Sequence, residues 1–275
     1  MHLRLPGKGS VFFLLISMAL ATPPTVEEAT RLHLAGASVE AVELLLPEID
    51  QDPAAALALG RVFFANSQWA LAEAAYHRVP RDSPLWFRSR LEATWAVYYL
   101  DPTHERAIAR ALLLYTEDPT DWELRYLIGI LVLHCGGAGS GRVGELAAEL
   151  LQELIEDLKA EINKALHPST SLMDRAYAAE VLWWEIGGPR DSGLYEHQPR
   201  CGWASLGAAP QVGALSLDSP VTRAILLTLT GKQGRFRSPT GGCSLHRADC
   251  PDPRAHRKLD REARRWLRSY RDELD

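Results

Sequence analysis

The sequence lacks several features that mark particular classes of protein. Its longest apolar stretch, residues 11–21, is far shorter than the about 20 residues that a membrane-spanning helix needs. It holds no Asn-x-Ser/Thr sequon, so nothing points to N-glycosylation. Since 47% of its 275 residues are apolar and 24% charged, disorder and a collagen-like fibre are excluded. Lysine (5) and asparagine (2) are scarce beside 25 arginines, a bias typical of GC-rich bacterial genomes.

The first 21 residues have the pattern of an export signal. Arg4 and Lys8 supply a positive head, residues 11–16 an apolar middle, and Ala19-Leu20-Ala21 a small-residue cleavage site. We expect cleavage after Ala21 and a periplasmic or secreted protein without a stable membrane span. An uncleaved anchor helix or a buried core segment is the alternative. Because the residue directly after the expected cleavage site is Thr22 and not a cysteine, a bacterial lipoprotein anchor is not supported.

Four cysteines, in an exported protein, favour two disulfides over free thiols. They are Cys135, Cys201, Cys243 and Cys250. Three pairings are open to them. Cys243 with Cys250 is the easiest pair to close because the loop between them is short, which would leave Cys135 for Cys201.

Helical periodicity dominates residues 22–187, between breaks at Asp-Pro, Ser-Pro or Gly-Gly, and no convincing strand appears. A pattern of three residues with offsets of four and twelve recurs in this part at distances of 31 and 35 residues. Its three copies are Ala41, Leu45 and Pro53; Ala72, Tyr76 and Pro84; and Ala107, Ala111 and Pro119. That period predicts stacked helical hairpins, because one helix pair cannot cover its own apolar face.

These residues resemble the tetratricopeptide repeat. Residues 53–86 fit best, with Leu59-Gly60 on the first helix, Ala72 and Tyr76 on the second, and Pro84 at the end. The units before and after keep fewer of these positions, and residues 87–121 have Thr94-Trp95 in place of Leu-Gly. The resemblance covers about residues 22–135. It implies an all-α fold, a TPR-like α-solenoid of helical hairpins.

Two longer helices, over 143–166 and 169–186, are predicted to cap this solenoid within residues 136–187. Residues 188–275 form a Cys-containing, less regular region that ends in a basic helix. Residues 22–187 hold 13 Lys/Arg and 25 Asp/Glu, a net charge of −12, and residues 188–275 hold 15 and 10, a net charge of +5. The basic region is therefore expected to be attracted to the acidic array or to an acidic partner.

The resemblance also implies a function. It implies a non-catalytic scaffold or adaptor of the cell envelope, whose concave groove binds a peptide or helix of another envelope protein without a cofactor. The groove positions of the family fall, in this sequence, on Arg61, Phe64, Glu92, Tyr99 and Tyr126. Arg61 would pair with a carboxylate of the partner and Glu92 with a basic group, and the aromatic residues would supply apolar contact.

Other motifs that suggest chemistry have simpler interpretations. The glycines of a G-x-G-x-x-G pattern, Gly139, Gly141 and Gly144, follow a predicted helix instead of a strand, which favours a loop over a nucleotide site. Two cysteines and two histidines have the loose spacing of metal ligands: Cys243, His246, Cys250 and His256. In an exported protein a disulfide is a better use of the two cysteine sulfurs than a zinc site. Neighbouring His134 and Cys135 point to different faces of a helix, so a cysteine protease is not expected.

The alternative function is an envelope hydrolase or metal-binding protein with its site in residues 188–275, using His197, His246 or His256. This region lacks a nucleophile elbow, a metalloprotease helix motif and a paired-acid arrangement, so we expect no catalytic residues and no metal. The basic helix over 255–274 interleaves arginines with acidic residues. This pattern favours internal ion pairs on a docked helix over binding of nucleic acid or anionic lipid.

Overall fold

The structure is a computed structural model that describes residues 23–136, 142–165, 169–186, 220–233, 253–272 and 274. Within these ranges all regular elements are helical, and the all-α prediction is confirmed there. The described residues divide into two compact units. Unit 1 comprises residues 23–102 together with Leu274, and unit 2 comprises the residues from 103 to 272.

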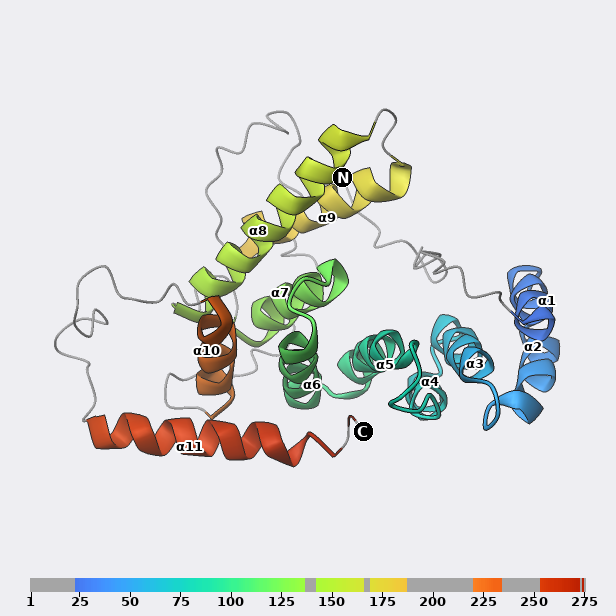
Figure 1. Cartoon of the computed structure of the whole chain (residues 1–275), viewed down its shortest axis with the longest axis horizontal. Helices are drawn as coiled ribbons and strands as arrows, with labels where there is room; N and C mark the ends of the chain where they lie inside the picture. Colours follow the sequence, from blue (N-terminus) through green and yellow to red (C-terminus); the bar gives the residue numbers. More distant parts are fainter. Residues whose placement is uncertain are drawn as a thin grey trace. The chain divides into compact units, whose positions relative to one another are not determined.

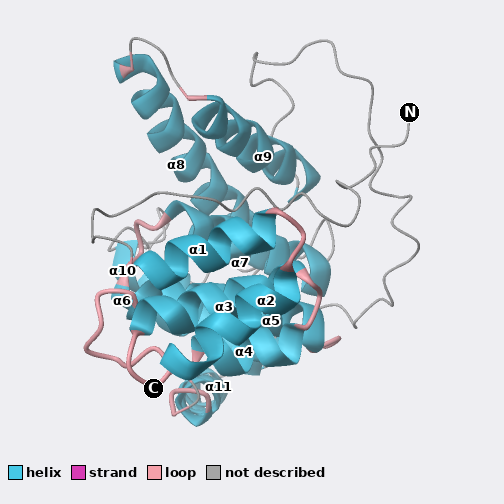
Figure 2. Cartoon of the chain, turned by 90° about the vertical axis from the view of Figure 1, so that its right-hand side faces the viewer, coloured by secondary structure: helices cyan, strands magenta, loops and turns pink. Residues whose placement is uncertain are grey.

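Unit 1 is a succession of short helices. They are α1 (Pro24–Leu34), α2 (Ser38–Leu45), α3 (Pro53–Ala65), α4 (Trp69–Tyr76) and α5 (Trp86–Leu100), with a 3-10 turn over Leu46–Glu48. Each α-helix packs against the next along the chain, and α1 also packs against α3 (Figures 1 and 2). Proline stands at the first position of α3, and the side chain of Asp52 accepts a hydrogen bond from the amide of Ala54 at 2.8 Å. This cap satisfies one of the free amides at the start of the helix.

The core of unit 1 is built largely from alanine, leucine and valine. Its buried members on the first three helices include Val26, Ala29, Ala41, Leu45, Ala55, Leu59 and Val62. Small side chains allow close helix approach, as at Gly60 of α3, where an added methyl group would overlap the ring of Tyr76 on α4. Tyr76 is fully buried. The glycine and the aromatic residue of the 53–86 unit therefore pack directly against each other.

Unit 2 holds longer helices. They are α6 (Glu105–Glu117), α7 (Trp122–Gly136), α8 (Arg142–Lys164), α9 (Thr170–Ile186), α10 (Pro220–Gln233) and α11 (Pro253–Ser269). Helices α6 to α9 pack in chain order, and α10 packs against α6, α8 and α11. The long helices predicted over 143–166 and 169–186 are confirmed as α8 and α9. Gly129 of α7 packs against the side chains of Leu151 and Leu182, where a methyl group would stand 3.0 Å from both.

The last predicted helix is shorter than expected. It ends at Ser269 instead of continuing to 274, because the amides of Tyr270 and Arg271 bond to carbonyls only three residues back. Bonds of this kind tighten and close the final turn. None of the helices described is both long and apolar enough to cross a membrane.

Several predictions fall outside the described residues. These are the signal segment, the glycines Gly139 and Gly141, the cysteines Cys201, Cys243 and Cys250, and the histidines His197 and His246. The side chains of Cys135 in α7 and His256 in α11 are also outside the description. The disulfides and the predicted boundaries at 135 and 187 stay predictions.

Candidate functional site

An ion pair joins the first helix of the 53–86 unit to the helix that follows that unit. Arg61 of α3 donates from Nε to both carboxylate oxygens of Glu92 on α5, at 3.1 and 3.0 Å, and from Nη2 to Oε1 at 2.7 Å. The Glu92 side chain is only 10% exposed, whereas that of Arg61 is 44% exposed. In this pair the carboxylate of Glu92 is buried, whereas the side chain of Arg61 is partly exposed to solvent.

A second arginine shares the same carboxylate. Arg88 lies one turn before Glu92 on α5 and donates from Nε to Oε1 at 2.6 Å. Burial by itself raises the pKa of the Glu92 carboxyl, but the charges and hydrogen bonds of Arg61 and Arg88 outweigh it, and the pKa is lowered. Glu92 is therefore held as a carboxylate between two guanidinium groups.

Tyr76 completes the cluster from α4. Burial, and then the nearby charge of Glu92, raise the pKa of the Tyr76 hydroxyl well above its ordinary value. The hydroxyl is therefore held in its neutral, protonated form. Together, Arg61, Arg88, Glu92 and Tyr76 connect α3, α4 and α5 through one polar cluster.

Three aromatic rings lie on these same helices, and we call them the aromatic face: Phe64 of α3, Trp69 of α4 and Tyr99 of α5. Trp69 stacks on Tyr99 with ring centroids 4.5 Å apart, and Phe64 meets Trp69 and Tyr99 edge to face at 4.8 and 5.9 Å. Such geometries are favourable for aromatic pairs. Tyr99 is still 48% exposed, and Phe64 and Trp69 are partly exposed.

The aromatic face continues inward along α5. Tyr98 contacts Tyr99 at 5.0 Å and Trp95 at 5.9 Å, both edge to face. Trp95 is buried in the core. The run of aromatic residues at 95–99 therefore supplies one core residue, Trp95, and one surface residue, Tyr99.

Four of the five predicted groove residues come together in unit 1. Arg61 and Phe64 lie one turn apart on α3, and Glu92 and Tyr99 lie two turns apart on α5. Since the pair 61–92 is followed along both helices by the pair 64–99, α3 and α5 run in the same general direction. Tyr126 is partly buried on α7 in unit 2, so it is described separately from the other four.

The charged residues have different neighbours from those predicted for them. Arg61 was expected to pair with a partner's carboxylate and Glu92 with a partner's basic group; in the structure they bond to each other. Arg61 keeps one amino group, Nη1, that donates to no acceptor in the described part of the chain. Their contact with a partner stays a prediction.

Sequence reasoning missed Arg88 and Trp69. Arg88 stands four residues before Glu92, a spacing that brings opposite charges together on a helix, and this signal was available. Trp69 begins α4 after a turn in which Ser67 has a φ of 59°. No periodicity predicts that this turn folds Trp69 back onto Phe64 and Tyr99.

The described residues contain no group of three or more His, Cys, Asp or Glu arranged to hold a metal ion. A cavity lined by Ile108, Leu131, Ile225 and neighbouring apolar residues in unit 2 has a volume of about 10 Å³. This volume is at the lower limit for one water molecule. The cavity is therefore a packing defect and not a ligand pocket.

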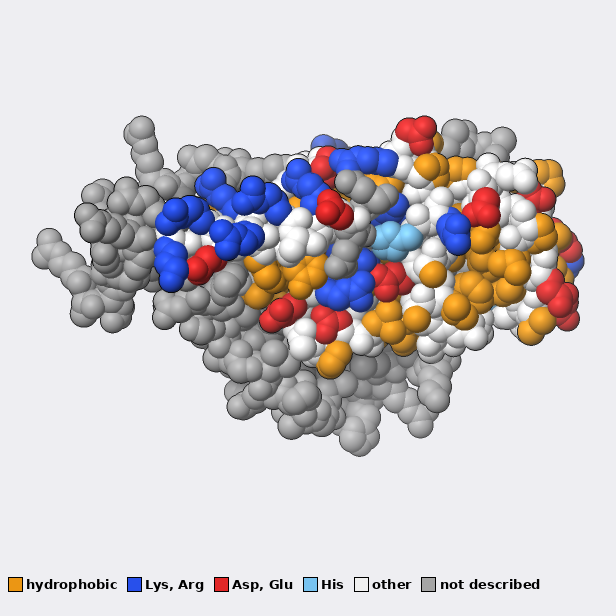
Figure 3. Space-filling view, turned by 90° about the horizontal axis from the view of Figure 1, so that it is seen from below, with side chains coloured by type: hydrophobic (Ala, Val, Ile, Leu, Met, Phe, Trp, Pro, Cys, Tyr) orange, Lys and Arg blue, Asp and Glu red, His pale blue; other side chains and the backbone are white. Residues whose placement is uncertain are grey.

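The basic helix α11 exposes Lys258, Arg261, Arg264, Arg265 and Arg268, and Figure 3 shows Lys and Arg side chains gathered along it. Two ion pairs involve its acidic residues. Glu262 pairs with Lys258 within the helix at 3.8 Å, and Asp260 accepts a hydrogen bond from Arg223 of α10 at 2.5 Å. The predicted internal pair is thus present, and α11 is docked on α10.

Comparison with known proteins adds no relative: no family model, no curated protein and no solved structure matches this chain.

Proposed function

We propose that this protein is a non-catalytic interaction scaffold of the bacterial cell envelope, periplasmic or secreted, and built as a TPR-like α-solenoid. Its binding surface is the groove side of α3 and α5, where the aromatic face contacts a peptide or helix of another envelope protein. The signal pattern of residues 1–21 supports the location. The direct packing of Gly60 on Tyr76 and the side-chain pairing of α3 with α5 support the repeat architecture.

The observation that carries the proposal is the aromatic face. Phe64, Trp69 and Tyr99 come from three helices and hold one another by ring contacts, yet they remain partly exposed. A rigid group of aromatic side chains loses little conformational entropy when it binds, which is why such residues dominate protein interfaces. The nearby polar cluster fixes the spacing of the helices that carry them.

Arg61 adds a polar contact beside the rings. Its Nη1 amino group has no acceptor among the described residues, and its other donors bond to Glu92, so the guanidinium is already oriented. A charge-assisted hydrogen bond from an oriented arginine to a carboxylate is stronger than a neutral one. The favoured ligand is therefore a segment that places an apolar or aromatic side chain one helical turn from an acidic group.

The test begins with selection of binders from a displayed random-peptide library on the full chain. The best peptide is then titrated calorimetrically against Phe64→Ala/Tyr99→Ala, and we expect its affinity to fall at least tenfold. Leu34→Ala/Val39→Ala is the control, since it removes two exposed apolar side chains of unit 1, 68% and 69% exposed, that lie outside the aromatic face. Equal affinity for native and double variant, with both folded, would refute the proposal, as would a library that yields no binder.

A further inference from the structure

A second polar centre of unit 1 lies on the opposite side of α5 from Glu92. Arg90 stands two positions before Glu92, which is about 200° around an α-helix. Its side chain is almost fully buried, with 1% of the residue exposed, and its guanidinium lies 5.6 Å from the ring centroid of the buried Trp86. Arg90 is thus separate from the aromatic face.

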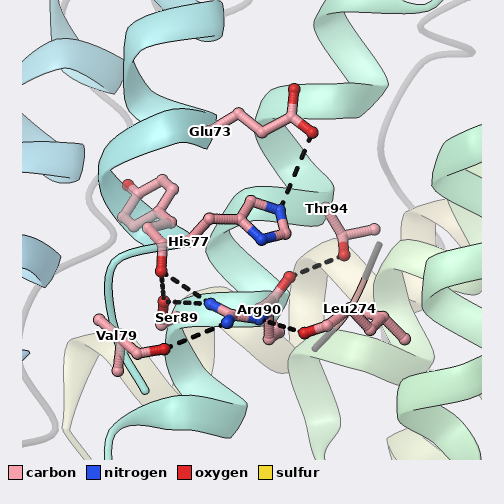
Figure 4. A network of polar contacts seen from close by, with 8 residues as sticks. Glu73, His77, Val79, Ser89, Arg90, Thr94 and Leu274 are labelled. Atoms are coloured by element: carbon pink, nitrogen blue, oxygen red, sulfur yellow. Dashed lines mark hydrogen bonds and ion pairs between the residues drawn. The ribbon is translucent and has the colours of Figure 1, made fainter. Parts of the chain in front are cut away.

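Two of the bonds of Arg90 close the turn between α4 and α5. Nη1 donates to the carbonyl of Tyr76 at 2.8 Å and Nη2 to the carbonyl of Val79 at 3.1 Å (Figure 4). Ser89 donates its hydroxyl to the same Tyr76 carbonyl. Tyr76 is the last residue of α4, and carbonyls at a helix end lack a partner within the helix. These contacts explain why a cation is buried here.

The third side of the guanidinium bonds to a residue 184 positions later in the sequence. Nε of Arg90 donates to the carbonyl of Leu274 (Figure 4). Leu274 is the one described residue after 102 that belongs to unit 1, and it is 5% exposed. Arg90 therefore binds the backbone carbonyl of a residue that is itself buried and carries a leucine side chain.

We propose that Arg90 and the α4–α5 turn form a second binding site of unit 1, specific for a leucine-bearing peptide segment that offers a main-chain carbonyl to Nε. Leu274 occupies this site as a detachable ligand from the same chain. One leucine and one hydrogen bond are few contacts, and a free peptide of this kind binds weakly. A tethered segment has an effective concentration on the order of millimolar and keeps the site filled.

Withdrawal of Leu274 opens the site for a matching segment of another molecule. Opening leaves the Nε–H of Arg90 without this acceptor in a buried place, which is unfavourable, so the open site favours a replacement that restores the same bond. The ligand class is thus defined by the occupant that the chain already provides. This inference does not depend on the proposed function, because the aromatic face and Arg90 lie on opposite sides of α5.

The first experiment titrates a fluorescent peptide with the sequence of residues 268–275 against full-length Leu274→Asp and against the native chain. Because the native site is already filled, we expect the peptide to bind Leu274→Asp at least tenfold more tightly. The same peptide with aspartate in place of its leucine should bind neither protein. The control protein is Leu34→Asp, which makes the same substitution at an exposed leucine of unit 1.

The second experiment measures hydrogen exchange of the backbone amides in residues 77–90. Exchange should be faster in Leu274→Asp than in the native chain or in Leu34→Asp, and addition of the 268–275 peptide should slow it again. Unchanged exchange in a folded Leu274→Asp variant would overturn the contact itself. Faster exchange that the peptide does not slow, or equal peptide affinity for native and variant chains, would overturn the binding site.

Discussion

Gly60 on α3 and Tyr76 on α4 touch with no space between them for a methyl group. The two helices can approach this closely only because position 60 has no side chain. The same ring is part of the polar cluster around Glu92, so the approach also sets the distance between α3 and the cluster's tyrosine. A packing contact in the 53–86 unit therefore positions the candidate binding surface.

Gly60→Ala is expected to destabilise the protein by about 1–3 kcal/mol through overpacking, although alanine is about 1 kcal/mol better than glycine within a helix. Tyr76→Leu in the same chain should recover part of the loss, because it removes the ring that the methyl group meets. Chemical denaturation of the two single variants and the double variant measures this coupling. Strict additivity of the two changes would contradict the contact.

The pH dependence of stability should report Glu92. Its folded pKa lies below the ordinary value of 4.5, so its stabilising contribution is full above that value and is lost as the pH falls through the folded pKa. The free energy of unfolding of native protein minus that of Glu92→Gln should therefore be larger at pH 7 than at pH 3. Urea denaturation at the two pH values measures it.

In the Arg61→Met/Arg88→Met double variant, the contribution of Glu92 to the free energy of unfolding should depend on pH in the opposite direction. Without the two arginines, burial governs the Glu92 carboxyl and raises its pKa. Its contribution should then favour the folded state more as the pH falls. If the free energy of unfolding of the native protein minus that of Glu92→Gln does not change with pH, the arginines do not hold the carboxylate as described.

The two arginines should act as alternatives for one another. Loss of Arg61 or Arg88 alone leaves Glu92 with one cation, and we expect each Met substitution to cost about 0.5–1.5 kcal/mol. Loss of both leaves a buried carboxylate unpaired, which is expected to cost about 3–5 kcal/mol. Adding Glu92→Met to the double variant should restore most of this loss, because it removes the buried charge. Equal stability of the double and triple variants would argue against the cluster.

Asp52 should stabilise the start of α3. Its side chain caps the amide of Ala54, and Asp52→Ala is expected to cost about 1 kcal/mol. Asp50→Ala is the matched control, since Asp50 is well exposed and its carboxylate pairs with the exposed Arg78 at 3.2 Å. A surface pair of this kind contributes about 0–1 kcal/mol. Thermal unfolding of both variants compares the two sites, and a larger loss for Asp50→Ala would contradict the cap.

Trp69 is predicted to contribute to peptide binding although the sequence pattern did not select it. Trp69→Ala removes the ring that stacks on Tyr99 and should weaken binding of a selected peptide by about 1 kcal/mol or more. Leu71→Ala changes an exposed apolar side chain on the same helix that lies outside the aromatic face. Calorimetric titration should show weaker peptide binding to Trp69→Ala than to Leu71→Ala. An equal loss of affinity in both variants would show that the aromatic face has been defined wrongly.

Much of the helical fold was predictable from local pattern. The apolar spacing in 143–166 and 169–186 predicted α8 and α9, and Asp-Pro before residue 54 predicted the start of α3. The repeat pattern of 53–86 also predicted Tyr76 as a core aromatic residue, and it is buried, but the pattern did not predict that Tyr76 touches Gly60. The end of α11 was not predictable in this way, because charged residues continue past Ser269 in a sequence that still favours a helix, whereas the backbone has already turned.

The candidate site was only partly predictable, for a different reason. Register placed Arg61, Phe64, Glu92 and Tyr99 on related helical faces, but it could not give the distance between those faces. At the actual spacing, Arg61 and Glu92 reach each other and Tyr99 stacks on Trp69. Arg90 was not selected at all, because its acceptors at Tyr76, Val79 and Leu274 are backbone carbonyls that carry no side-chain signal.

The sequence by itself determined the helices and the positions at which they break, because these depend on spacing along one chain. Tertiary structure decided which charges neutralise each other, which rings remain exposed and where Leu274 lies. Those outcomes depend on distances between segments that are far apart in sequence, and such distances are fixed only when the helices pack.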